Sequence, residues 1–423
     1  MNIIDVQYID ITLYSAVCRA LLKRTLARAL AYVVLTICLG VLRQARRGAR
    51  LAAGPRRACE SGPGLFRSAC QPARRRPAPR SHGIQLNVTS KIDTVLITGG
   101  AGYIGSHGVL AFRAAGHPVV VLDDLSTGRR SAVGDDVPFV LGDAGDRDLI
   151  GKTLRDHGVG AVVHFAGSVV VPESVADPLK YYWNNTCVSR NLIAACVEHG
   201  VRRFIFSSTA AVYGVPEVMP VAETTPTEPI NPYGASKLMT EWILRDTAAA
   251  HDFSYVALRY FNVSGADPEG RRGQNSRTAT HLIEVATRAA LGVQDGLDVY
   301  GDDYDTPDGT CVRDYIHVSD LAAAHVLALK HLNAGGDTAV LNLGNGRGHS
   351  VREVVETVRR VTGRDFPVRQ APRRAGDPAC LVADASAARA VLGWQPRRAA
   401  LEQQIADAWN WRQKCQNITA AET

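Results

Sequence analysis

The sequence has no closely spaced cysteine pair and no histidine cluster of the kind that binds metals. Its nine cysteines form no C-x-x-C motif, and its twelve histidines include no H-E-x-x-H pattern. We therefore expect no metal site. Scattered cysteines of this kind are typical of reduced thiols, which favours a cytoplasmic protein.

A hydrophobic run long enough to cross a membrane is also missing. The apolar run at residues 29–42 has 14 residues, whereas a transmembrane helix needs about 20. Basic residues flank it, and no small-residue cleavage site follows, so secretion is not expected. Residues 1–90 could be a membrane anchor or interfacial helix, a targeting segment, or upstream sequence attached through an early start codon. We favour the last interpretation, and expect membrane contact only if this leader belongs to the protein.

Negative charge is scarce at the N-terminus only. Residues 1–90 hold 14 Arg and 1 Lys against 3 acids, a net charge of +12, although the whole chain carries only +7. Residues 91–423 therefore carry a net charge of −5. A mildly acidic body argues against a nucleic-acid-binding surface.

A glycine-rich turn follows the first predicted strand. Residues 94–98 form an apolar run, and the sequence TGGAGYIGSH at 98–107 leads into a helical pattern. Gly99, Gly102 and Gly105 fall at i, i+3 and i+6, which suits a tight turn, a close approach to a diphosphate and the packing of helix on strand. This unit predicts a dinucleotide site at the helix N-terminus.

An acidic residue ends the second predicted strand. Asp123 follows the apolar residues 119–122 and lies 18 positions after Gly105, near where dinucleotide folds place the acid that binds the adenosine ribose. A carboxylate there favours NAD over NADP, although Arg129 and Arg130 keep NADP open.

Strands and helices alternate through the next hundred residues. We expect strands at 139–141, 161–165 and 203–207, with helices near 146–158 and 178–198. The order predicts an α/β fold with a doubly wound parallel sheet. Ligands of such sheets bind at the carboxyl ends of the strands. The residues expected to converge there are Gly99, Asp123, Asp143, Ala166 and Thr209.

Tyr233 and Lys237 lie at i and i+4 of a predicted helix, so both side chains share one face. The pKa of tyrosine is about 10, too high for a base at neutral pH. We expect the Lys237 ammonium and a positively charged nicotinamide to lower the pKa of Tyr233. Thr209 could then share the substrate proton, which suits removal of a proton from a carbinol as its hydride leaves.

Residues 95 to about 411, roughly three quarters of the chain, resemble the UDP-glucose 4-epimerases of the extended short-chain dehydrogenase/reductase family. Besides TGGAGYIGSH, the matching motifs include YGASK at 233–237, RYFN at 259–262 and VRDYIHV at 312–318. Further matches lie at 122–126, 164–167, 173–175, 181–185, 204–209, 211–214 and 373–377.

The resemblance implies roles for individual residues. Cofactor contacts are implied for Gly99, Gly102, Tyr103, Ile104 and Gly105 at the pyrophosphate, Asp123 at the ribose, Asp143 and Ala144 at the adenine, and Phe165, Ala166, Asn184, Tyr233, Lys237 and Tyr260 at the nicotinamide half. Substrate contacts are implied for Thr209, Tyr233, Asn262, His281, Arg313, Arg374, Asp377 and Leu381. Tyr233 would be the base, Lys237 would hold the nicotinamide ribose, and the two arginines would bind a diphosphate.

Three positions depart from the family pattern. Between Gly265 and Leu282 the family usually has an acidic, proline-containing loop ahead of a Leu-Ile-Pro or Leu-Met-Pro sequence. This chain reads RRGQNSRTATHLIE at 271–284, so Glu284 replaces the proline. His281 stands where Asn is frequent, and could equally be a surface helix cap. Val169 replaces a lysine that some members carry near the cofactor diphosphate.

The sequence therefore predicts a leader at 1–90, an NAD-binding domain at 91–265 with a return segment near 313–343, and a UDP-sugar-binding lobe at 266–416. The expected activity is interconversion of UDP-glucose and UDP-galactose with NAD, by a homodimer. The alternatives are a 4-epimerase for another UDP-sugar and a catalytically silent nucleotide-sugar-binding protein. A 4,6-dehydratase would need an acidic pair after Thr209, where this chain has Ala210 and Ala211.

Overall fold

The computed structural model describes residues 93–275, 280–374 and 377–421, with side chains to residue 417. The predicted leader at 1–90 lies outside the described residues. Within those three ranges, no helix combines the length and apolar character needed to span a membrane.

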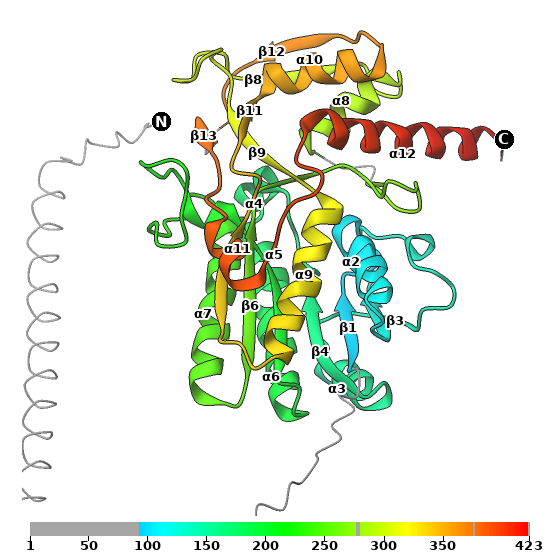
Figure 1. Cartoon of the computed structure of the whole chain (residues 1–423), viewed down its shortest axis with the longest axis vertical. Coiled ribbons are helices and arrows are strands. Elements are labelled where there is room, and N and C mark those ends of the chain that lie inside the picture. The colour runs from blue at the N-terminus through cyan, green and yellow to red at the C-terminus, as the bar shows by residue number, and fades with distance from the viewer. Residues whose placement is uncertain (1–92, 276–279, 375–376, 422–423) are drawn as a thin grey trace, which may run out of the picture. The chain divides into compact units, whose positions relative to one another are not determined.

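A parallel sheet of seven strands forms the centre of the described chain, in the order β10-β6-β5-β4-β1-β2-β3 (Figure 1). This confirms the predicted doubly wound parallel sheet. The strands are β1 (Thr94–Thr98), β2 (Val119–Asp123), β3 (Phe139–Leu141), β4 (Val159–His164), β5 (Arg203–Thr209), β6 (Ser254–Tyr260) and β10 (Ala339–Leu343).

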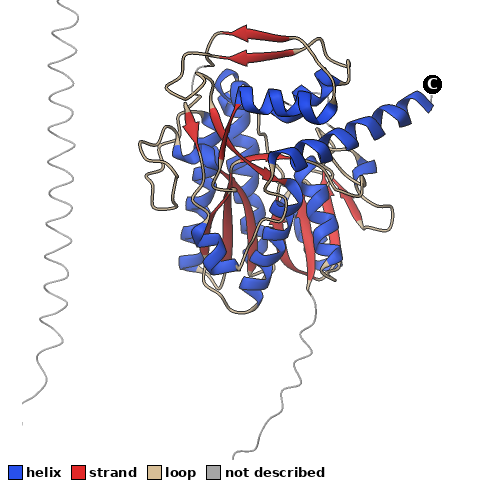
Figure 2. Cartoon of the chain, turned by 45° about the horizontal axis from the view of Figure 1, so that its top comes forward, coloured by secondary structure: helices blue, strands red, loops and turns tan. Residues whose placement is uncertain are grey.

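Helices cover both faces of this sheet (Figure 2). Successive side chains of a strand point to opposite faces, so Ile97 joins one core with α2 and α9 while Leu96 joins another with α3, α6 and α7. The helices are α2 (Tyr103–Ala114), α3 (Arg147–Asp156), α4 (Val171–Ala176), α5 (Pro178–Tyr181), α6 (Val188–Glu198), α7 (Pro232–Ala250), α9 (Val318–Asn333) and α11 (Ser386–Leu392). A π-helical segment, η2 (Tyr182–Cys187), joins α5 to α6, and 3-10 turns form η1 (Arg130–Ala132) and η3 (Ala210–Tyr213).

A smaller group of elements lies beyond the sheet's carboxyl edge (Figure 1). Strand β9 (Val312–His317) pairs with β7 (Asn262–Ser264), β11 (Gly348–Ser350) and β13 (Cys380–Leu381), and β8 (Leu297–Tyr300) pairs with β12 (Val368–Ala371). Helices α8 (Leu282–Ala290), α10 (Val351–Thr362) and α12 (Leu401–Ala421) share a separate hydrophobic core here.

The chain crosses between the two groups more than once. Of the segment 313–343, which we expected to rejoin the large domain, α9 packs on α2 and β10 pairs with β6. The first part, β9, belongs instead to the small mixed sheet. Residues distant in sequence therefore meet at the carboxyl edge of the large sheet.

Candidate active site

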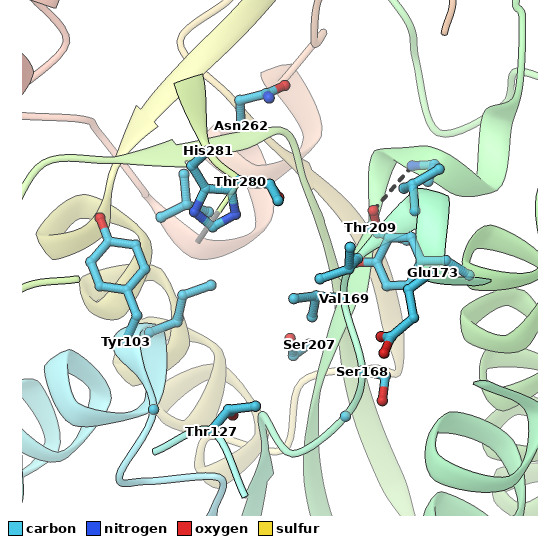
Figure 3. A pocket seen from close by; sticks show the side chains of 18 of the residues that line it. Tyr103, Thr127, Ser168, Val169, Glu173, Ser207, Thr209, Asn262, Thr280 and His281 are labelled. Atoms are coloured by element: carbon cyan, nitrogen blue, oxygen red, sulfur yellow. Dashed lines mark hydrogen bonds between the residues drawn. The ribbon is translucent and has the colours of Figure 1, made fainter. Parts of the chain in front are cut away.

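One cavity of about 1620 Å³ lies at the carboxyl ends of the large sheet's strands. Residues at or just after the ends of β1 to β6 line it, which is where parallel sheets bind their ligands. Figure 3 shows Tyr103, His281 and Asn262 on one side of it and Thr209 and Glu173 on the other. The structure brings all of the sequence-predicted site residues to this cavity: Gly99, Gly102, Tyr103, Ile104, Gly105, Asp123, Asp143, Ala144, Phe165, Ala166, Asn184, Thr209, Tyr233, Lys237, Tyr260, Asn262, His281, Arg313, Arg374, Asp377 and Leu381. Their individual roles remain predictions.

The backbone around the turn between β1 and α2 leaves no room for a side chain at Gly99 or Gly105. Gly99 has a φ of +69°, and a Cβ there would lie 2.6 Å from the Ala166 nitrogen. A Cβ on Gly105 would lie 2.1 Å from the Gly99 carbonyl oxygen. No side chain caps the N-terminus of α2. The N–H groups of its first turn and the helix dipole therefore face the cavity, which fits the diphosphate of a dinucleotide.

Asp123 is fixed beside this turn. Its carboxylate accepts hydrogen bonds from the backbone N–H of Ala101 at 2.9 Å and of Leu125 at 2.8 Å. Burial raises its pKa, and these two bonds oppose that rise. An oriented carboxylate in the cavity wall suits a ribose diol. Nearby Asp143 is exposed and accepts from the Gly145 N–H at 2.7 Å.

The segment after β4 forms another part of the cavity wall. The Asn184 amide donates to Ser168 Oγ at 3.0 Å, and the Phe165 ring lies 4.6 Å from that of His325. Val169, which replaces a lysine of some family members, is 53% exposed and lines the cavity. These contacts hold the segment beside Lys237 without supplying a charge of their own.

Tyr233 and Lys237 stand in the first turns of α7, as the i, i+4 spacing predicts. Asn231 caps this helix by accepting the Gly234 N–H, and Pro232 occupies its first position. Lys237 is 2% exposed and donates from Nζ to the Ser207 carbonyl at 3.1 Å. Burial lowers the pKa of Lys237 to about 8.

The expected lowering of the Tyr233 pKa is wrong for the protein alone. Burial raises the pKa of Tyr233, because a phenolate is disfavoured away from water, and only a hydrogen bond with Thr209 opposes this. The Lys237 ammonium donates to the Ser207 carbonyl rather than to the phenol. The expectation rested on sequence spacing, which fixes the helix face that two side chains share. Spacing does not fix which acceptor each side chain reaches.

A second set of charged groups lies across the cavity. Arg313 on β9 approaches Asp377 at 3.6 Å, and the Arg374 guanidinium lies 3.7 Å from the centre of the Tyr300 ring. The stacking restricts the guanidinium plane, so it presents a fixed donor edge. Sequence analysis missed Tyr300, because it lies on β8, far in sequence from the residues that it supports.

His281 and Leu381 have mixed surroundings. His281 is the first residue before α8, but its side chain makes no capping bond and its ring lies 6.3 Å from that of Tyr103. Leu381 is 8% exposed and packs in a cluster with Phe261 and Ala383, yet it also lines the cavity.

A dinucleotide turn, a buried Tyr–Lys pair and a basic subsite in one crevice define a nucleotide-dependent enzyme of the short-chain dehydrogenase class. The model of the NAD dependent epimerase/dehydratase family matches residues 95–344, and the chain belongs to that family. NAD is its cofactor, in agreement with the fit of the glycine turn and Asp123.

Known relatives agree with this assignment. A UDP-glucose 4-epimerase of Azospirillum brasilense is 57% identical over 76% of this chain and 93% of its own length. The structure of the Bifidobacterium longum UDP-glucose 4-epimerase in complex with NAD+ and UDP is 40% identical, with a TM-score of 0.73 over 77% of this chain and 99% of that one. The UDP-Glc/GlcNAc 4-epimerase of Campylobacter jejuni is 47% identical, with a TM-score of 0.67 over 76% of this chain and all of that one.

Proposed function

We propose that the protein interconverts UDP-glucose and UDP-galactose by transient oxidation at C4 of the hexose. The observation that carries this proposal is the meeting of Thr209, Tyr233 and Lys237 in one cavity with Arg313 and Arg374. The first three residues suit proton transfer at a carbinol, and the two guanidiniums suit a diphosphate. The relatives described above carry the same activity in their names.

The chain's own residues manage the proton. When bound, NAD+ accepts the hydride from C4 and returns it. Tyr233 takes the O4 proton as general base, and Thr209 shares a hydrogen bond with its hydroxyl. Lys237, whose pKa burial lowers to about 8, lies one helical turn away and would hold the nicotinamide ribose. The proton returns from Tyr233 when the sugar has turned and the hydride reaches its other face.

The nucleotide end anchors the substrate while the sugar turns. Arg313 and Arg374 lie on the small-lobe side of the cavity and would bind the diphosphate, and Asp377 would accept from a ribose hydroxyl. Tight binding of the nucleotide keeps the substrate in the site, while the sugar itself has to stay loose enough to rotate.

Purified protein incubated with UDP-galactose, without added NAD, tests this function. We expect UDP-glucose to form and no NADH to accumulate, because the hydride returns in each cycle. Binding of UDP-sugars without conversion would support the silent nucleotide-sugar-binding alternative. Conversion of only UDP-pentoses or UDP-uronates would support a different 4-epimerase.

The N-acetylated sugar pair is a second candidate, because the Campylobacter jejuni relative is named a UDP-Glc/GlcNAc 4-epimerase. Leu381 is an intermediate-sized residue in the cavity wall, and close packing leaves little room for an extra acetyl group. We expect weak activity on UDP-N-acetylglucosamine, and we expect Leu381→Ser to raise the kcat/KM ratio of that sugar over UDP-glucose by about 10-fold. Steady-state kinetics on both sugars measure the ratio.

Leu392→Ser is the matched control for this substitution. Leu392 is also 8% exposed, but it lies in the core beneath α11. Its substitution removes the same atoms and should lower the melting temperature without changing the ratio. An unchanged ratio in Leu381→Ser would show that this leucine serves packing alone.

We infer that the enzyme is a homodimer. Leu179 and Trp183, on α5 and η2, are 77% and 60% exposed, and Trp242 on the adjacent α7 is 46% exposed. Large apolar side chains gathered on neighbouring helices favour association with a second copy. A monomeric mass in light scattering would contradict this inference.

We also infer that the enzyme acts in the cytoplasm. The five cysteines of the described chain are free thiols, as is usual in a reducing compartment. Epimerase activity in the soluble fraction of lysed cells, rather than in the membrane fraction, is the expected result.

A further inference from the structure

Three consecutive residues at the end of β5 contact three residues along one face of α7. The Thr209 hydroxyl bonds to Tyr233, the Ser207 carbonyl accepts from Lys237, and the Ser208 hydroxyl donates to the carboxylate of Glu241. The helix residues are spaced at i, i+4 and i+8, so they lie on one line along the helix. Two of these contacts involve the proposed proton-transfer residues, whereas the proposed mechanism uses neither Ser208 nor Glu241.

Glu241 is held in a buried ion pair. Its side chain is 5% exposed, and that of its partner Arg259 on β6 is 8% exposed. Arg259 donates from Nε to Oε1 at 2.9 Å and from Nη2 to Oε2 at 2.6 Å, which gives the two-point geometry of a strong pair. The ion pair therefore joins α7 to the large sheet directly below the cavity.

The guanidinium also reaches the turn that follows Thr209. Arg259 Nη1 donates to the Tyr213 hydroxyl at 3.0 Å, and that hydroxyl donates to Asn342 Oδ1 on β10 at 2.7 Å. Tyr213 ends the short turn η3, which begins immediately after Thr209. The network thus holds the backbone on both sides of Thr209: through Ser208 before it, and through Tyr213 after it.

A buried ion pair adds little to the free energy of unfolding in comparison with apolar packing. Removing two charges from water has a large free-energy cost, and well-packed apolar residues often stabilise a core equally well or better. What such a network provides is a fixed relative position of the elements that it joins. Here those elements carry Thr209 on one side and Tyr233 on the other.

We propose that Ser208, Glu241 and Arg259 are positioning residues that set the register of α7 against β5, and so hold the Thr209 hydroxyl against the Tyr233 phenol. This proposal rests on the proposed function for its effect on turnover, but not for its effect on the phenol itself. Burial raises the pKa of Tyr233, and the Thr209 hydrogen bond is the one interaction that opposes this rise. Loosening the register should therefore make the phenol harder to ionise.

Ser208→Ala tests the proposal, because it removes one hydroxyl and leaves the ion pair intact. In the NAD-bound enzyme, the Tyr233 phenolate is titrated by ultraviolet absorbance, as the difference between each protein and its Tyr233→Phe counterpart. We expect Ser208→Ala to move this titration to higher pH. The other titratable groups facing Tyr233 are Lys237, Tyr181 and Tyr260, and all three are unchanged.

Turnover gives a second measurement. We expect Ser208→Ala to lower kcat by about 10-fold, since small misplacements of reacting groups have large effects, while KM for UDP-galactose and the bound NAD stay unchanged. The acid limb of the kcat profile should move to higher pH with the phenol, because Tyr233 has to be ionised to accept a proton. Glu241→Gln, which keeps an acceptor for Ser208 but removes the charge that pairs with Arg259, should move both measurements in the same direction.

Ser264→Ala is the matched control. Ser264 is a buried serine whose hydroxyl bonds to Gln404, away from α7. It should lower the melting temperature to a similar extent and leave the phenol titration unchanged. An unmoved titration in Ser208→Ala, or an equal shift in Ser264→Ala, would overturn the proposal. If the unmodified protein fails to epimerise any UDP-sugar, the proposed function fails, and the phenol titration still decides the positioning role.

Discussion

Replacing Tyr233 by phenylalanine is expected to lower kcat by about 10²- to 10⁴-fold, the range lost with a general base. Phenylalanine keeps the ring that packs edge-on against Tyr181 at 6.4 Å, so the fold and the cofactor site should survive. Only the hydroxyl that takes the O4 proton is lost. Conversion of UDP-galactose by the variant, together with its NAD content and melting temperature, measures this.

Tyr255→Phe controls for the loss of a buried tyrosine hydroxyl. Tyr255 is 4% exposed and packs in the core between the sheet and its helices, away from the cavity. We expect it to keep full turnover. Near-normal epimerisation by Tyr233→Phe would show that another group accepts the proton.

Replacing Gly105 by alanine is expected to remove the bound cofactor and, with it, all activity. The added Cβ would lie 2.1 Å from the Gly99 carbonyl oxygen and 2.9 Å from the Gly100 Cα, and neither backbone atom can yield without moving the turn. Displacing the turn from the α2 N-terminus destroys the close approach of backbone to the diphosphate. Absorbance of NAD released from the purified variant measures the loss.

Gly116→Ala separates this effect from ordinary backbone strain. Gly116 has a φ of +85° and nothing within 4 Å of an added Cβ, so alanine there strains only the backbone, by about 1–2 kcal/mol. Its melting temperature should fall while its NAD content stays normal. Full retention of NAD by Gly105→Ala would show that the turn adapts and that its tightness does not define the site.

The parts of the site that the sequence predicts well are those encoded locally. The glycine spacing, Asp123 at a strand end and the Tyr233 and Lys237 pair depend on periods of a few residues, which strand and helix geometry fix. Each of these residues lines the cavity. Parallel topology then brings the strand ends together, whatever the length of the connections.

The parts that sequence reasoning missed depend on contacts between distant segments. The stacking of Arg374 on Tyr300 joins residues of a loop and of β8, and no periodicity relates them. The Tyr233 pKa depends on burial and on which acceptor Lys237 reaches, and both are settled only by packing. The placement of β9 in the small sheet has the same origin, since an apolar strand pattern does not specify its partner.

The position of β10 bears on how this protein folds during synthesis. Strand β10 pairs with β6, although residues 261–338 lie between the two strands and include much of the small lobe. Until β10 emerges, β6 is an unpaired edge, and without α9 the apolar face that it covers is open to water. The nucleotide-binding half is thus complete only after most of the chain has left the ribosome, which makes it a late-closing unit with a high contact order rather than an independent first domain.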